Sequence, residues 1–150
     1  MKKLLLLLFS LLISFNSYGE WRKVTESIEC PAKGDTYYVD IDTIKENGGY
    51  VYWYEMTDYF KRDEFGDMSA IIYLEGDCGL NRSRMLSGIF YKQPMCIDES
   101  VREIAKNPEW TYTSPGKINA VVLNFVCKNI LEELYIGNTN EKYTIPGIRE

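Results

Sequence analysis

The sequence predicts an α+β domain in which a small, meandering antiparallel sheet is covered by one C-terminal α-helix and held by disulfide bonds. Alternating apolar and polar segments separated by short turns indicate the strands. Apolar residues at helical spacing near the C-terminus indicate the helix. Four cysteines behind an N-terminal export signal indicate the disulfides.

The first 19 residues have the pattern of a secretory signal peptide. Lys2 and Lys3 form a positively charged start, residues 4–15 form an apolar run, and small residues follow. We expect cleavage between Gly19 and Glu20. A transmembrane anchor would need about 20 apolar residues. No later run reaches that length, so we do not expect the mature chain to be an integral membrane protein.

The mature chain is acidic and contains no histidine. Loss of the signal peptide leaves 15 of the 17 basic residues against 22 acidic ones, a formal charge of −7, which argues against a nucleic-acid partner. The missing histidine removes the commonest metal ligand and the usual general base near neutral pH. We therefore expect no enzyme activity, no cofactor and no metal. Residues 20–137 are expected to form one domain, followed by a polar tail at 138–150.

The first half of the domain contains the clearest strand patterns. Residues 21–28 alternate weakly and predict a first strand or a leading segment. Residues 36–44 alternate strictly, and residues 50–59 return with many aromatic and β-branched side chains. The glycine-rich turn at 47–49 between them predicts an antiparallel hairpin.

Two further strands follow a charged loop at 60–67. They are expected at residues 68–77 and 80–91, joined by a short turn, so the sheet is antiparallel. The segment at 92–117 contains three prolines and is expected to be irregular, with one or two helical turns at 99–106.

The C-terminal part of the domain changes to a helical period. We expect the helix to end near Gly137 and to be about 15 to 20 residues long. Its apolar residues would cover one face of the sheet; they include Ile118, Val121, Val122, Phe125 and Val126.

The cysteines indicate two disulfide bonds. They are Cys30, Cys78, Cys96 and Cys127, and spacing alone leaves three pairings open. A Cys78–Cys127 bond would join the start of a strand to the helix, and a Cys30–Cys96 bond would join two proline-containing loops. The alternative for Cys78 is a reactive thiol whose anionic form is favoured by nearby arginines, although no histidine is present to act as its base.

Two patterns of aromatic and basic residues mark a candidate binding face. Tyr50, Tyr52 and Tyr54 share one side of a predicted strand, and Arg82 and Arg84 share one side of another. Tyrosine and arginine supply large contacts and are frequent in protein interfaces. These five residues are therefore the predicted partner-binding site.

A structural interpretation of the same residues is also open. The arginines could be solvated, or could face acidic neighbours such as Glu75 or Asp77. The tyrosines could be covered by the segment at 92–117 or by a second subunit, because large exposed apolar patches are uncommon.

A series of short motifs runs along the chain. They are Trp21 near the mature start, YYVD-IDTI, G-YVYWYEMTDY, SAIIYLEGDC, a strand with two arginines, W-TYTSPG, and a helix ending in VC. In this order they resemble the bacterial surface-adhesin protein E family, over roughly residues 21–128. The resemblance implies a small antiparallel sheet of about six strands with a helix packed on it, and a Cys78–Cys127 bridge.

The resemblance also implies a function, that of an exported adhesin that binds host extracellular-matrix components and haem-like ligands. This chain differs in lacking histidine and a lipid-attachment cysteine behind the signal peptide. The predicted function is therefore noncatalytic binding of an extracellular or envelope partner through the aromatic and arginine face, in the periplasm or at the cell surface. The alternative is a periplasmic module that binds a small ligand or inhibits an envelope enzyme.

Overall fold

The computed structural model describes residues 19–29, 32–98 and 100–139. Nearly all of the predicted signal peptide lies outside the described residues, as do Cys30 and most of the predicted tail. The signal peptide, its cleavage site and the domain boundaries therefore stay predictions.

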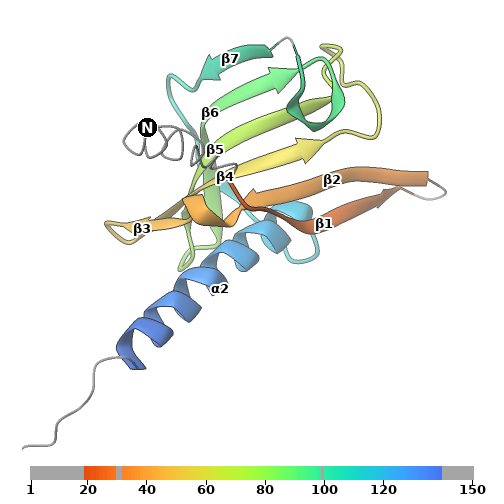
Figure 1. The fold of residues 1–150 in the computed structure, drawn as a ribbon. Coiled ribbons are helices and arrows are strands. Elements are labelled where there is room, and N and C mark those ends of the chain that lie inside the picture. The colour runs from red at the N-terminus through yellow and green to blue at the C-terminus, as the bar shows by residue number, and fades with distance from the viewer. Residues whose placement is uncertain (1–18, 30–31, 99, 140–150) are drawn as a thin grey trace, which may run out of the picture.

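Within the described chain, eight strands form one antiparallel sheet (Figure 1). Six follow one another across the sheet in the order β1-β2-β4-β5-β6-β7, while β3 pairs with β4 and β8 pairs with β6. The predicted antiparallel meander is therefore confirmed, and the described sheet has eight strands where the resemblance implied about six. The strands are β1 (Trp21–Glu29), β2 (Ala32–Asp40), β3 (Lys45–Asn47), β4 (Tyr50–Asp58), β5 (Ser69–Asp77), β6 (Arg82–Tyr91), β7 (Ser100–Ile104) and β8 (Thr111–Tyr112).

The predicted hairpin between the first two clear strands needs one correction. β2 and β4 are antiparallel neighbours as expected, but the turn at 47–49 joins β4 to the short strand β3. The reason is that the 3-10 turn η1 (Ile41–Thr43) ends β2 first. The carboxylate of Asp40 caps this turn by accepting a hydrogen bond from the backbone N–H of Asp42 at 3.2 Å.

The prediction of helical turns at 99–106 is wrong, because this segment contains strand β7. β7 pairs with β6, and Val101 lies opposite Phe90. The backbone groups along the open edge of β6 need hydrogen-bond partners, and β7 supplies them. A short segment of mixed propensity therefore becomes a strand through its tertiary context.

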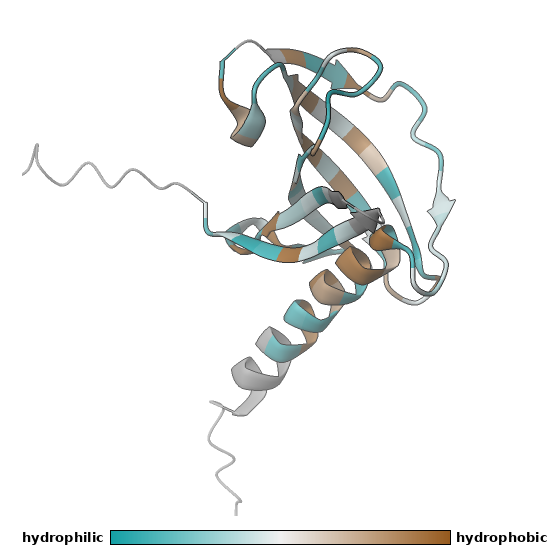
Figure 2. Cartoon of the chain, turned by 90° about the vertical axis from the view of Figure 1, so that its right-hand side faces the viewer, coloured by the Kyte–Doolittle hydropathy of each residue, from teal (hydrophilic) through white to brown (hydrophobic). Residues whose placement is uncertain are grey.

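The helix α2 (Ile118–Thr139) packs on one face of the sheet, below β1, β2 and β4 (Figure 1). From β4, Val51 and Trp53 enter the core and meet Val122, Leu123 and Val126 of the helix. Trp53 is only 1% exposed. Figure 2 shows hydrophobic residues in the first turns of α2, where it meets the sheet. Their burial is the main stabilising contact between helix and sheet.

The helix is longer than predicted. It has 22 residues and continues past Gly137, the predicted stop, to Thr139. A glycine lowers helix stability by about 1 kcal/mol relative to alanine but does not by itself end a helix. Among the residues that the structure describes, no helix combines the length and apolar character needed to cross a membrane.

One of the two predicted disulfide bonds is present. Cys78 and Cys127 are bonded, with their Cα atoms 5.9 Å apart, and link the turn after β5 to α2. Cys96 is a free cysteine in the structure and Cys30 lies outside the described residues, so a Cys30–Cys96 bond stays a prediction. A 3-10 turn after β6 holds Cys96, whose backbone N–H donates to Ser69 Oγ at 2.9 Å.

Candidate functional site

The predicted tyrosines lie on the side of the sheet away from α2. Side chains alternate between the two faces of a strand, and β4 directs Val51 and Trp53 into the core beneath it. Tyr50, Tyr52 and Tyr54 therefore project from the opposite face. Arg82 and Arg84 lie on that face too, because both stack on Trp110, whose ring stacks on Tyr50.

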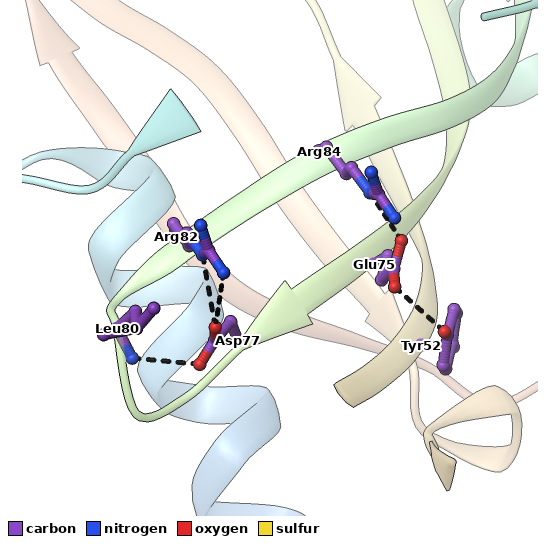
Figure 3. Close-up of polar contacts among 6 residues, drawn as sticks. All are labelled: Tyr52, Glu75, Asp77, Leu80, Arg82 and Arg84. Carbon is purple, nitrogen blue, oxygen red and sulfur yellow. Dashed lines mark hydrogen bonds and ion pairs between the residues drawn. The ribbon is translucent and has the colours of Figure 1, made fainter. Parts of the chain in front are cut away.

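One cross-strand row joins Tyr52, Glu75 and Arg84 on neighbouring strands (Figure 3). The Tyr52 hydroxyl donates to Glu75 Oε1 at 3.0 Å, and Arg84 Nε donates to Glu75 Oε2 at 2.6 Å. The Glu75 side chain is almost fully buried, so these bonds satisfy a carboxylate that would be costly to bury alone. Burial raises the pKa of Tyr52, and its bond to Glu75 raises it further, which keeps the hydroxyl protonated as a donor.

A second pair, Asp77 and Arg82, lies next to this row (Figure 3). Asp77 Oδ2 accepts from both Nε and Nη2 of Arg82 at 3.1 Å. Its other oxygen accepts from the backbone N–H of Leu80 at 2.9 Å, which closes the turn between β5 and β6. The bond from Leu80 and those from Arg82 hold the pKa of Asp77 below its ordinary value. Of the two structural interpretations left open for the arginines, solvated or facing acidic neighbours, the structure has the second.

Trp110 covers one end of the face. It precedes β8, and its ring stacks on Tyr50 with the centroids 5.6 Å apart. The guanidinium carbons of Arg82 and Arg84 each lie 4.4 Å from the indole centroid, within the range of cation–π attraction. Three predicted site residues therefore hold one indole ring, and the segment at 92–117 covers this part of the face.

The other end of the face is more open. Tyr54 stacks on Tyr73 of β5 with the ring centroids 4.7 Å apart, and it is 38% exposed. At the end that Trp110 covers, Tyr112 of β8 lies opposite Arg82, whose guanidinium carbon is 5.9 Å from the Tyr112 ring centroid, and Tyr112 is nevertheless 64% exposed. Aromatic rings held by their neighbours therefore remain accessible to solvent.

The structure brings the five predicted residues together. The arginines, however, have a structural role, whereas we predicted that they would contact a partner. Their charges are largely matched by Glu75 and Asp77 within the protein, so they position the aromatic side chains and the turn. We name the assembly the aromatic–arginine face; its members are Tyr50, Tyr52, Tyr54, Tyr73, Arg82, Arg84, Trp110 and Tyr112.

Sequence reasoning missed three aromatic members of this face. Tyr73 lies on a strand whose pairing decides which tyrosine it meets, and the pairing has to be known first. Trp110 and Tyr112 fall in a segment that we expected to be irregular. Their signal was the motif W-TYTSPG, which carried part of the family resemblance but did not show which face it would cover.

The face contains no arrangement for nucleophilic or metal chemistry. Its titratable groups are tyrosines, arginines and two carboxylates already engaged in ion pairs. Within the described ranges, no group of three or more histidine, cysteine, aspartate or glutamate side chains could hold a metal ion. What the arrangement offers is a rigid aromatic contact surface.

The family model described as Surface-adhesin protein E matches residues 21–128. The chain belongs to this family. The resemblance inferred from the sequence motifs is thereby confirmed. The surface-adhesin protein E family indicates a non-enzymatic surface protein that binds partners outside the cell.

Two solved structures of Haemophilus influenzae protein E resemble this fold. The structure from a non-typeable strain has a TM-score of 0.52 and 13% identity, and the match covers 77% of this chain and 79% of that one. Crystal form II has a TM-score of 0.47 and 15% identity, with 62% and 80% covered. At such identities, the first likeness supports the fold alone. No curated protein sequence matches the chain.

Proposed function

We propose that this member of the surface-adhesin protein E family is an exported, noncatalytic adhesin whose aromatic–arginine face contacts an extracellular or envelope partner. The observation that carries the proposal is the set of stacked rings on the side of the sheet away from α2, with Tyr54 and Tyr112 exposed. The partner is a protein or other ligand with flat apolar and hydrogen-bonding surface, which tyrosine can contact with both ring and hydroxyl.

The stacking and the ion pairs that hold these rings in place favour binding. Ordering flexible side chains on association costs about 0.5–1.5 kcal/mol for each immobilised side chain. Here the stacking of Tyr54 on Tyr73, and the ion pairs of Arg82 and Arg84, fix much of the face before a partner arrives. The Cys78–Cys127 bond secures the turn next to this face in an oxidising compartment.

Replacing both exposed tyrosines should reduce partner binding. We expect the Tyr54→Ala/Tyr112→Ala variant of the mature protein to bind an immobilised extracellular-matrix extract at least about tenfold more weakly, because buried aromatic anchors dominate interface energies. The measurement is the concentration dependence of binding to coated plates, with albumin-coated plates as background.

A matched control removes exposed aromatic residues from a different part of the surface. Phe60 and Phe65 are 49% and 73% exposed in the loop between β4 and β5. Their double alanine variant should bind as the wild type does. An equal loss in both double variants, or no loss in the tyrosine variant, would contradict the proposed face.

The location of the protein separates the adhesin from the periplasmic alternative. If it is a surface adhesin, protease added to intact cells should remove a tagged copy while a periplasmic control protein survives. Protection of the tagged copy until the outer membrane is opened would reject the adhesin and favour a periplasmic module that binds a small ligand or inhibits an envelope enzyme.

A further inference from the structure

A cavity of about 400 Å³ lies on the opposite side of the sheet from the aromatic–arginine face. It opens where the start of α2 meets the helix-facing side chains of the central strands. This volume is within the range of small-molecule sites, about 300–1,000 Å³. The lining residues are Tyr37, Trp53, Glu55, Leu74, Ser83, Lys117, Ile118 and Asn119.

Glu55 is the acidic residue of this cavity, and few hydrogen-bond or ion-pair partners compensate the charge of its carboxylate. Its contact is one long hydrogen bond, donated by Trp53 Nε1 to Glu55 Oε2 at 3.4 Å. Among the described side chains it forms no ion pair, although Lys117 lines the same cavity. By contrast, the two carboxylates of the opposite face each have an arginine. A buried charge without such a partner is costly.

We propose that this cavity binds a small organic ammonium ion, whose cationic head meets the Glu55 carboxylate and whose apolar body lies against Tyr37, Trp53 and Leu74. The site is separate from the face assigned to adhesion and does not depend on that assignment. A single carboxylate surrounded by aromatic and aliphatic atoms suits a weakly hydrated organic cation, since aromatic rings also attract cations. A hard metal ion would need several oxygen ligands.

The charge of Glu55 should make binding depend on pH. Burial raises the pKa of Glu55 to about 7, and the hydrogen bond from Trp53 offsets part of that rise. The other titratable or charged groups lining the cavity are Tyr37 on β2 and Lys117 ahead of α2. Burial raises the pKa of Tyr37 to about 12, so its phenol stays neutral. Binding of a permanent cation should therefore strengthen as pH rises through about 7.

Choline and 3,3-dimethylbutan-1-ol provide a matched pair of probes, because they share a shape and differ in the charge. The readout is the indole N–H resonance of Trp53 in ¹H–¹⁵N NMR spectra, assigned with Trp21→Phe and Trp110→Phe variants. We expect saturable shifts with choline at pH 8, about tenfold weaker binding at pH 5.5, and about tenfold weaker binding of the neutral alcohol.

The variant Glu55→Gln keeps the shape of the side chain and removes its charge. It should weaken choline binding at pH 8 about tenfold, whereas the exposed loop variant Glu64→Gln should leave it unchanged. Choline binding that is equal at both pH values or insensitive to Glu55→Gln would overturn the proposal. So would equal shifts from the neutral alcohol, or no shift of the Trp53 resonance at millimolar choline.

Discussion

Replacing Cys78 and Cys127 together with alanine should lower the free energy of unfolding by about 4 kcal/mol. The two residues are 49 positions apart and are bonded. In the chain-entropy account, the crosslink restricts the unfolded chain, and a loop of this length contributes about 4 kcal/mol. That is a large part of the 5–15 kcal/mol that typically separates folded from unfolded domains.

The loss of stability should first appear at the contact between helix and sheet. Cys127 lies next to Val126, which is fully buried against the sheet, so the bond fixes the helix where its apolar side chains meet Trp53. Urea unfolding followed by far-UV circular dichroism measures the effect. The control is Cys96→Ala, which removes a free, partly buried thiol and should cost less than about 1.5 kcal/mol. A double variant as stable as wild type would contradict the prediction.

The fold was predictable from sequence where a strand has one buried face. Period-2 alternation and short turns identified β2, β4, β5 and β6 and placed them in a meander. β7 was missed because it becomes a strand through pairing with the open edge of β6, and periodicity within a short segment does not record such a partner. The turn at 47–49 was recognised but assigned to the wrong pair, because the 3-10 turn after Asp40 left no clear pattern.

The candidate site, like the fold, was predictable from sequence only in part. Residues two positions apart in a strand share a face. The sequence therefore placed Tyr50, Tyr52 and Tyr54 together on one face of their strand, and the two arginines together on one face of theirs. Which acidic residue meets each arginine, and which ring covers them, depends on register and on a loop far along the chain. Glu55 carried no signal as a site residue, because the cavity around it forms only when α2 docks on the sheet.

Replacing Glu55 with glutamine should stabilise the protein at neutral and alkaline pH. The carboxyl has an ordinary pKa of 4.5, which burial in the folded protein raises to about 7. The folded state therefore holds this proton more tightly than the unfolded state. Wild-type stability is unaffected by the group below pH 4.5, falls as pH rises from 4.5 to about 7, and stays reduced above that.

The full shift corresponds to about 3 kcal/mol. Because Glu55 keeps some contact with solvent, we expect Glu55→Gln to add about 2 to 3 kcal/mol at pH 8 and close to nothing at pH 4. Urea unfolding at a series of pH values, followed by tryptophan fluorescence, measures the difference from wild type. Glu64→Gln removes an exposed carboxylate and should give a flat difference.

The sign of that difference also tests what surrounds the carboxylate. If Lys117 or the first backbone N–H groups of α2 compensated the charge of Glu55 in solution, glutamine would lose that attraction and the variant would be less stable at pH 8. A gain that grows from pH 4.5 to 7 instead means that the folded protein retains an uncompensated negative charge beside Trp53. Such a charge lowers stability without a ligand, and a bound cation that matched it would restore the loss.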